Sequence, residues 1–368
     1  MASEMHIQAE EFGQRLAQVK EAMSRRGLEG LIVFGLGPQR LGNLAYLANY
    51  RPSPALCMGG QEAACHALVL AREGLGQLVS PLAQAREALA NVEGVKSGAD
   101  FNGELAAAVR SKGLARARLG VAGSDLMPVQ VWLALNKALP TSQLEPADDI
   151  LRDLRCIKSP QEIECLGRAA RVGEQALLAA LDSALPGSNE RQVELRARGA
   201  AYEVGAESIA RVTVNSGRSL RHRTVPATDR VLRDGDFILV EMAGWAFDYA
   251  FSCAKVKVVG EGTSQQAEQL QSLEDAAAWL VETLKPQEHK SYVKTMHGEQ
   301  QILPLAHGIG LDLYEYPWIA MEPTNKRPTI HPNSVMCIEP LVIDPKFGSM
   351  AIRKMVLVGE ASSRVLGE

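Results

Sequence analysis

The sequence predicts an α/β N-terminal domain, residues 1–150, followed by an α+β C-terminal domain, residues 151–368. Short aliphatic runs that alternate with helical stretches indicate the first domain. An Ala- and Leu-rich helical stretch, residues 151–185, and the strand-like runs that follow it indicate the second. A chain of 368 residues with 46% hydrophobic content is long enough to bury a core in each domain.

The N-terminal domain is predicted to begin with a helix. Four apolar residues recur at helical spacing between positions 10 and 26, namely Phe12, Leu16, Val19 and Met23. Gly27 follows them as a C-terminal stop. Four short aliphatic runs then predict strands at residues 31–34, 66–70, 77–80 and 119–122. Because helical segments separate these runs, they predict a single α/β layer.

The C-terminal domain is predicted to open with a linker helix up to Lys158 and a long helix from Ser159. Pro160 then occupies the first helical position, where its missing N–H costs nothing. Further helices are predicted at residues 189–202 and 265–284. Strand-like runs occur at residues 237–242, 247–258, 335–343 and 351–358. Helices and strands in separate blocks are typical of an α+β domain.

Composition excludes several classes of partner. The 39 Lys and Arg against 43 Asp and Glu leave a formal charge of -4, which gives no field suited to a nucleic-acid backbone. No apolar run approaches the roughly 20 residues of a membrane helix, and the N-terminus lacks a basic and apolar leader. We therefore expect a cytoplasmic protein with no nucleic-acid or membrane partner. The six cysteines form no C-x-x-C pair, and we expect free thiols at Cys57, Cys65, Cys156, Cys165, Cys253 and Cys337.

Three stretches of the C-terminal domain share a pattern with known proteins: residues 235–244 (GDFILVEMAG), 307–317 (HGIGLDLYEYP) and 335–340 (VMCIEP). In order and spacing they resemble the pita-bread family, which includes aminopeptidase P, prolidase and creatinase. Residues 43–50 (NLAYLANY) resemble the creatinase-type N-terminal domain, and residues 157–163 (IKSPQEI) its junction with the catalytic domain. The resemblance covers almost the whole chain. It implies a creatinase-like N-terminal domain, a pita-bread C-terminal domain and a homodimer.

The metal-dependent members of that family bridge two divalent ions with two Asp, one His and two Glu. Matched position by position, Glu241 replaces the first Asp, and His307 and Glu339 correspond to the His and the first Glu. Ser252 occupies the position of the second Asp, and Arg353 that of the second Glu. A guanidinium cannot ligate a metal and repels one beside it. The resemblance thus leaves three candidate ligands of five, and we expect no metal and no other cofactor.

Three interpretations of this cluster stay open, because the fold is expected to bring Glu241, His307, Glu339 and Arg353 together. Arg353 can replace the metals as a structural counter-ion for the buried carboxylates. The guanidinium and the carboxylates can instead form a pocket for a small polar substrate. The third interpretation is a single metal held by Glu241, His307 and Glu339.

Residues 216–226 (SGRSLRHRTVP) resemble the stretch in which the family keeps a histidine near the scissile bond. The matching residue is His222, and an imidazole can take a proton from water and return it to a leaving nitrogen. The alternative is a surface histidine in an Arg-rich loop. Arg221 and Arg223 flank His222 and favour an anionic substrate.

Tyr314 and Arg51 are further candidates for substrate binding. Tyr314 occupies the position of the family's second histidine, and a phenol can orient a carbonyl but is a poor base near neutral pH. Arg51 lies where creatinase-like dimers send an arginine into the neighbouring subunit's pocket. Its alternative is a solvated loop residue.

The expected function is that of a metal-independent, creatinase-like enzyme that hydrolyses or rearranges a C–N bond in a small carboxylate-bearing substrate. The predicted catalytic residues are His222, Glu241 and Glu339. The predicted substrate-binding residues are Arg353, His307, Tyr314, Ser252, Arg221, Arg223 and Arg51. Two alternatives remain: a non-catalytic pita-bread protein that binds a ligand or partner, and a mononuclear metal-dependent peptidase similar to aminopeptidase P or prolidase.

Overall fold

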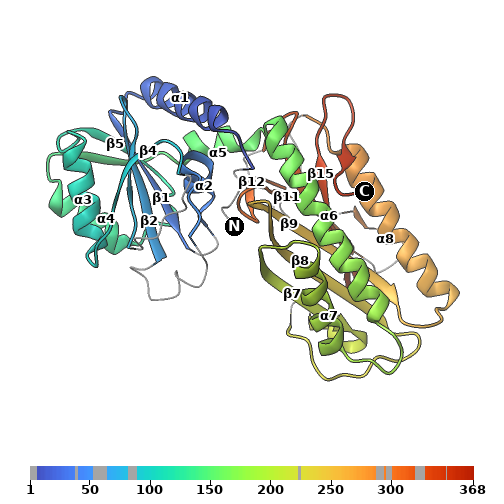
Figure 1. Ribbon diagram of the computed structural model, residues 1–368. Coiled ribbons are helices and arrows are strands. Elements are labelled where there is room, and N and C mark those ends of the chain that lie inside the picture. Colours follow the sequence, from blue (N-terminus) through green and yellow to red (C-terminus); the bar gives the residue numbers. More distant parts are fainter. Residues whose placement is uncertain are drawn as a thin grey trace. The chain divides into compact units, whose positions relative to one another are not determined.

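The computed structural model describes residues 6–37, 40–52, 64–81, 89–222, 225–286, 294–295, 301–319, 328–344 and 346–368. The chain divides into two compact units, Met1–Arg155 and Cys156–Glu368 (Figure 1). The expected fold class, an α/β unit followed by an α+β unit, is confirmed. Within the described ranges, no helix is both long and apolar enough to cross a bilayer.

The N-terminal unit is built on a six-stranded mixed sheet with the order β4-β3-β2-β1-β5-β6. Its strands are β1 (Gly30–Leu36), β2 (Cys65–Ala71), β3 (Gly76–Val79), β4 (Val92–Lys96), β5 (Arg118–Ala122) and β6 (Gln143–Pro146). Strand β1 pairs antiparallel with β2 and parallel with β5. The four predicted strands correspond to β1, β2, β3 and β5. The sequence did not indicate β4 and β6, because these edge strands are short and only partly buried.

Five helices accompany this sheet: α1 (Ala9–Arg25), α2 (Gly42–Ala48), α3 (Phe101–Ser111), α4 (Val129–Ala138) and α5 (Asp148–Cys156). The apolar stripe predicted for the first helix is buried, and its four residues, Phe12, Leu16, Val19 and Met23, are at most 7% exposed. Phe101 of α3 and Leu135 of α4 pack in one core with Ile32 of β1. Helix amphipathicity therefore predicted the packing face correctly.

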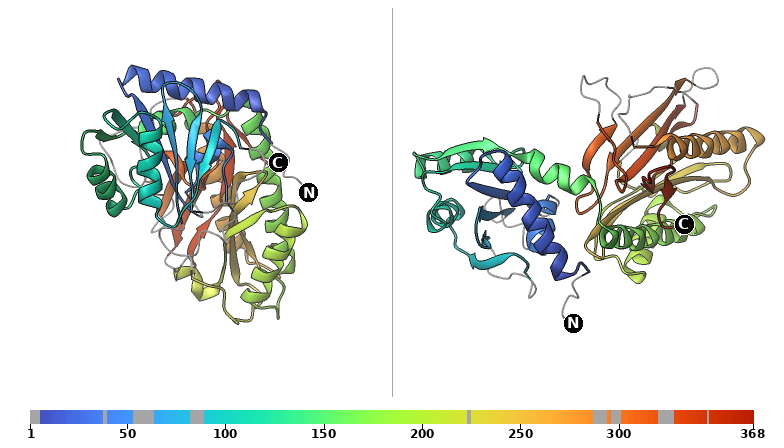
Figure 2. Two further views of the ribbon diagram at one scale, coloured as in Figure 1. Left: turned by 60° about the vertical axis from the view of Figure 1, so that its left-hand side comes forward. Right: turned by 90° about the horizontal axis from the view of Figure 1, so that it is seen from above.

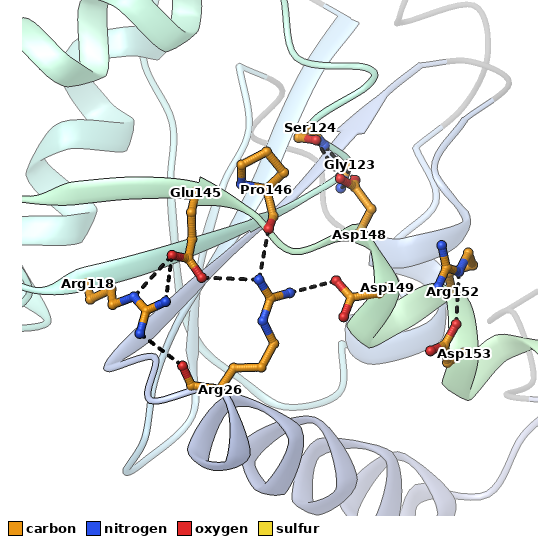
Figure 3. Close-up of polar contacts among 10 residues, drawn as sticks. All are labelled: Arg26, Arg118, Gly123, Ser124, Glu145, Pro146, Asp148, Asp149, Arg152 and Asp153. Carbon is orange, nitrogen blue, oxygen red and sulfur yellow. Dashed lines mark hydrogen bonds and ion pairs between the residues drawn. The ribbon is translucent and has the colours of Figure 1, made fainter.

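Ion pairs join the end of α1 to the edge strand β6 and to α5 (Figure 3). Glu145 of β6 accepts hydrogen bonds from Arg118 Nε and Nη2, at 3.0 and 2.9 Å, and from Arg26 Nη2 at 3.1 Å. Arg26 also pairs with Asp149 at 2.6 Å. All four side chains are 28% to 46% exposed, so each pair contributes about 1 kcal/mol or less. The network therefore holds the edge strand in position but adds little to the free energy of unfolding of the unit.

His66 of β2 forms a buried polar cluster with Tyr50 and Ser80. His66 Nδ1 lies 3.1 Å from both Tyr50 Oη and Ser80 Oγ, and the two hydroxyls are 2.7 Å apart. All three residues are at most 1% exposed. Burial lowers the pKa of the His66 imidazole to about 4, so the folded protein keeps it neutral at pH 7.

We expect this cluster to make the protein less stable as the pH falls below about 6.5. The unfolded chain binds a proton at His66 near that pH, whereas the folded chain resists until about pH 4, so stability is lost as the pH falls through this window. Between pH 7 and pH 5, the free energy of unfolding of wild type should fall by about 2 kcal/mol more than that of His66→Asn. Urea unfolding at both pH values checks this, with His331→Asn at an exposed position as the control. The same pH dependence in wild type and His66→Asn would contradict it.

The C-terminal unit contains two sheets. The first has the order β7-β8-β9, formed by β7 (Ser208–Ser216), β8 (Phe237–Ala246) and β9 (Tyr249–Val258). The second runs β10-β11-β13-β15-β16, with β12 paired to β11 and β14 to β13. Its strands are β10 (Lys294–Thr295), β11 (Gln301–Gly308), β12 (Glu315–Ile319), β13 (Val335–Asp344), β14 (Gly348–Ala351), β15 (Lys354–Leu357) and β16 (Arg364–Val365).

Three helices lie against these sheets (Figure 2): α6 (Pro160–Ser183) packs on β8 and β9, α7 (Glu190–Glu203) on β7, and α8 (Ser264–Thr283) on β13. Helix α6 begins as predicted, because Ser159 is its N-cap and Pro160 its first residue. Ser159 Oγ accepts from the Glu162 main-chain N–H, and the Glu162 carboxylate accepts from the Ser159 N–H. This capping box fixes the start of the unit's central helix.

The strand predicted at residues 351–358 is interrupted at Arg353. Strand β14 ends at Ala351 and β15 begins at Lys354. Between them, Arg353 N donates to Ala254 O at 2.9 Å, and Ala254 N donates to Arg353 O at 3.3 Å. These bonds connect the two sheets of the unit. The local sequence could not show this break, because the pairing partner lies in β9.

Candidate functional site

Strand register in the larger sheet brings three predicted residues onto one face. His307 of β11 pairs with Cys337 of β13, which lies two residues before Glu339. The pairing of β15 with β13 places Arg353 beside Glu339. Paired residues, and residues two apart on one strand, point to the same face of a sheet. His307, Glu339 and Arg353 therefore share a face.

The smaller sheet adds Glu241 to this group. Glu241 of β8 pairs with Thr213 of β7 and with Ala254 of β9. Ala254 is the residue whose main chain bonds to Arg353. The junction between the two sheets therefore brings together carboxylates that are far apart in the sequence.

Arg353 forms a buried ion triad with Glu241 and Glu339. Its Nε donates to Glu339 Oε2 at 2.7 Å, and its Nη2 donates to Glu241 Oε1 at 3.1 Å. Thr213 Oγ1 donates to the other oxygen of Glu241 at 3.0 Å. Glu241 is 0% exposed, Arg353 5% and Glu339 8%. Burial lowers the pKa of the guanidinium, but Glu339 and Glu241 together outweigh it and hold that pKa above its ordinary value.

His307 borders the triad as a neutral imidazole. The side chain is 8% exposed, and its Nδ1–H donates to Gly308 O at 2.8 Å, which leaves Nε2 as an acceptor. Burial lowers the pKa of His307 to about 4, the hydrogen bond to Gly308 opposes that effect, and Arg353 adds to it. The imidazole is therefore uncharged near neutral pH.

Two exposed aromatic rings extend this face beyond His307. The Tyr314 ring lies 4.6 Å from the His307 ring, and the Trp318 ring 5.4 Å from it. Tyr314 and Trp318 are stacked on each other, with centroids 5.8 Å apart and an interplanar angle of 12°. They are 45% and 48% exposed. Tyr314 was predicted from the sequence, whereas Trp318 was not.

Ser252 lies next to the triad in a row of side chains, of which Ser252 and Ala243 are buried and Arg211 is half-buried. Ser252 pairs with Ala243 of β8, and Ala243 pairs with Arg211 of β7. Burial raises the pKa of the Cys337 thiol to about 12, and the Ser252 hydroxyl is among the groups that oppose this rise. As expected, the cysteines in the described ranges are free thiols, namely Cys65, Cys156, Cys165, Cys253 and Cys337, while Cys57 lies outside those ranges.

The centre does not fit the pair of divalent ions that metal-dependent members of the pita-bread family bind. The Arg353 guanidinium occupies the space between the two carboxylates, and both already accept hydrogen bonds from it. In the described part of the chain, no group of three or more His, Cys, Asp or Glu side chains is arranged to hold a metal ion. The positive charge that Glu241 and Glu339 surround is therefore a side chain of the protein itself, the Arg353 guanidinium.

A buried carboxylate fixes the loop that carries His222. Glu190, the first residue of α7, is 0% exposed and accepts five hydrogen bonds of 2.7 to 3.0 Å. The donors are main-chain and side-chain groups of Ser216 and Thr228 and the Ser219 hydroxyl. Both ends of the loop are thus tied to one side chain. The sequence did not single out Glu190, because a Glu in the first turn is also common as a simple dipole partner.

His222 ends the 3-10 helix η3 (Gly217–His222) and is exposed. Leu220, two residues earlier, is buried in the same apolar cluster as Ala254 and Ile352. The helix is therefore packed beside the residues that flank the triad. Arg221 is exposed next to His222, and Arg223 lies outside the described residues. Arg51 belongs to the N-terminal unit, so its contact with a pocket stays a prediction.

Comparison with known proteins gives a consistent match. Residues 164–360 match the model of metallopeptidase family M24, and residues 15–157 match that of the creatinase/prolidase N-terminal domain. An Xaa-Pro dipeptidase from Pyrococcus furiosus is 28% identical over 235 residues, which cover 61% of this chain and 66% of the relative. A probable dipeptidase, PepE, from Mycobacterium bovis is 26% identical over 365 residues, 96% of this chain and 93% of the relative.

Solved structures show the same fold over almost the whole chain. An Xaa-Pro dipeptidase from Bacillus anthracis has a TM-score of 0.77 at 19% identity, covering 97% of this chain and 98% of that one. An X-Pro aminopeptidase from Thermotoga maritima has a TM-score of 0.78 at 17% identity, covering 96% and 97%. At these identities the likeness concerns the fold.

These matches contradict the metal-independent, creatinase-like enzyme expected from the sequence. The model that covers the site describes metallopeptidases, and the relatives are named dipeptidases. The peptidase alternative is better supported. The expectation was wrong because it inferred the reaction from metal ligands that are missing. A missing ligand limits which metal ions a site can bind, but it does not determine which bond the protein cleaves.

Proposed function

The chain belongs to metallopeptidase family M24, and from that premise we propose that it hydrolyses the peptide bond of short peptides. The observation that carries this proposal is the family match over residues 164–360, which include Glu241, His307, Glu339 and Arg353. Relatives named Xaa-Pro dipeptidases make dipeptides that end in proline the first substrates to test. A cytoplasmic location and a homodimer remain predictions.

The arrangement of the site supports contact with a small polar molecule. Glu241 and Glu339 provide carboxylate oxygens, and neutral His307 provides an Nε2 acceptor. We assign these groups to orienting the peptide and the attacking water. His222 is the proposed acid and base that carries the proton to the leaving nitrogen. The remaining proposed substrate contacts are Arg353, Ser252, Tyr314, Arg221, Arg223 and Arg51.

A second candidate function is peptide binding without turnover. The ion triad favours it, because the Arg353 guanidinium is hydrogen-bonded to both Glu241 and Glu339, which are two of the three candidate metal ligands. The two candidates predict the same ligand and differ only in whether its peptide bond breaks.

We expect Ala-Pro and related dipeptides to be cleaved, and His222→Ala to lower kcat by about 100-fold or more with little change in KM. Free amino acids are quantified by chromatography, with Mn²⁺, Co²⁺ or Zn²⁺ added and with a chelator. His331→Ala, at an exposed position, is the matched control. Binding of the dipeptides without cleavage under any condition would select the second candidate, and absence of both binding and cleavage would remove both. An unchanged kcat in His222→Ala would remove this residue from the mechanism.

A further inference from the structure

Two arginine side chains at the centre have buried N–H groups with no acceptor. Neither Arg211 Nε nor Arg353 Nη1 has a hydrogen-bond partner among the described residues, although both atoms are buried. A buried donor left unpaired is destabilising, so such a group usually has a ligand or water as its acceptor. These two groups therefore indicate a missing acceptor.

Strand register places both arginines at the same junction. Arg211 pairs with Ala243, and Ala243 pairs with Ser252, so these side chains share the face of Glu241. Ala254, two residues after Ser252 on β9, bonds through its main chain to Arg353 of the other sheet.

A shared carboxylate connects the two arginines. Thr213, two residues after Arg211 on β7, donates to Glu241, and Glu241 also accepts from Arg353 Nη2. Arg211 and Arg353 therefore approach Glu241 from two different segments of the chain. Arg353 is matched by two carboxylates, Glu241 and Glu339, whereas Arg211 brings one further positive charge. The formal charges of the two guanidiniums and the two carboxylates, Glu241 and Glu339, therefore sum to zero.

We propose that Arg211 and Arg353 together bind the terminal carboxylate of a short peptide. The carboxylate oxygens accept from Arg211 Nε and Arg353 Nη1, the two donors that lack partners. Guanidinium groups match the planar geometry of a carboxylate, and burial strengthens the resulting charge-assisted bonds. The inference rests on the proposed function for the identity of the ligand, a short peptide. It adds that the peptide must end in a free acid.

The test compares Ala-Pro with its C-terminal amide. Affinity is measured by calorimetry, and kcat/KM wherever cleavage occurs. Wild type should bind or cleave the acid about tenfold better than the amide. Arg211→Met should remove that preference by weakening only the acid. Arg211→Lys should keep part of the preference, because it keeps the charge but loses the planar donor.

The control is Arg196→Met, which removes an exposed arginine of α7 and should leave the preference unchanged. Thermal unfolding verifies that Arg211→Met folds as wild type does. Equal affinity of wild type for acid and amide, equal weakening of both by Arg211→Met, or no binding of either peptide would overturn the inference. Cleavage of acid and amide at equal rates would remove the carboxylate site but keep the peptidase. Selective binding of the acid without cleavage would keep the site and remove the peptidase.

Discussion

Arg353→Met is expected to lower the free energy of unfolding by about 3–5 kcal/mol. The substitution leaves Glu241 and Glu339, at 0% and 8% exposure, without their shared counter-ion. Two buried carboxylates then repel each other and have lost their strongest hydrogen-bond donor. Urea unfolding followed by tryptophan fluorescence measures the loss.

Two further variants make this experiment decisive. Combining Arg353→Met with Glu241→Gln and Glu339→Gln removes all three charges and should restore most of the lost stability. Lys354→Met, at the next position, removes an ion pair with Glu368 that is 29% and 60% exposed, and should change stability by less than about 1 kcal/mol. If Arg353→Met is as stable as Lys354→Met, the triad does not support the fold.

The paired substitutions Ser252→Asp and Arg353→Glu are expected to create a strong site for a divalent cation. They replace the internal cation with two carboxylates beside Glu241, Glu339 and His307, which together form a hard-oxygen and imidazole ligand set. We expect the affinity for Mn²⁺ to rise by about 100-fold or more relative to wild type. Calorimetric titration, together with elemental analysis after dialysis, measures the change.

The matched control is the pair Ser252→Asn and Arg353→Gln. It has nearly the same size as the acidic pair but adds no negative charge, so it should gain little affinity. If both pairs bind Mn²⁺ equally, or neither gains affinity, then the charge at positions 252 and 353 does not decide what the centre holds.

Local sequence patterns predicted most of the fold. The stripe of Phe12, Leu16, Val19 and Met23 defined the buried face of α1, and Ser159 with Pro160 defined the start of α6. Both signals depend only on residues a few positions apart. Edge strands β4 and β6 and the break at Arg353 depend on pairing with distant strands, so the local sequence did not contain them.

The candidate site was predicted only in part. Resemblance placed Glu241, Glu339 and Arg353 together, and the structure brings them within hydrogen-bond distance. The sequence analysis missed Arg211. This residue lies two positions before Thr213 in β7, and the residues that follow each of them are valines. Polar residues two apart in a buried strand indicate a polar interior face, and that signal could have identified it.

The main prediction of the reaction was wrong, and the peptidase kept as an alternative is better supported. Ser252 and Arg353 led to a creatinase-like assignment, and the relatives instead support a peptidase. Side chains at single positions define local charge and donor geometry. Which bond is cleaved depends on how the whole pocket positions a substrate, and single positions do not determine that.

The most direct measurement is a high-resolution crystal structure of the wild-type protein grown in the presence of Mn²⁺, with anomalous data collected at the manganese edge. We expect the Arg353 guanidinium between the two carboxylates, with Nε on Glu339 and Nη2 on Glu241. A guanidinium turned out of the centre, with manganese bound by Glu241, His307 and Glu339, would contradict the account.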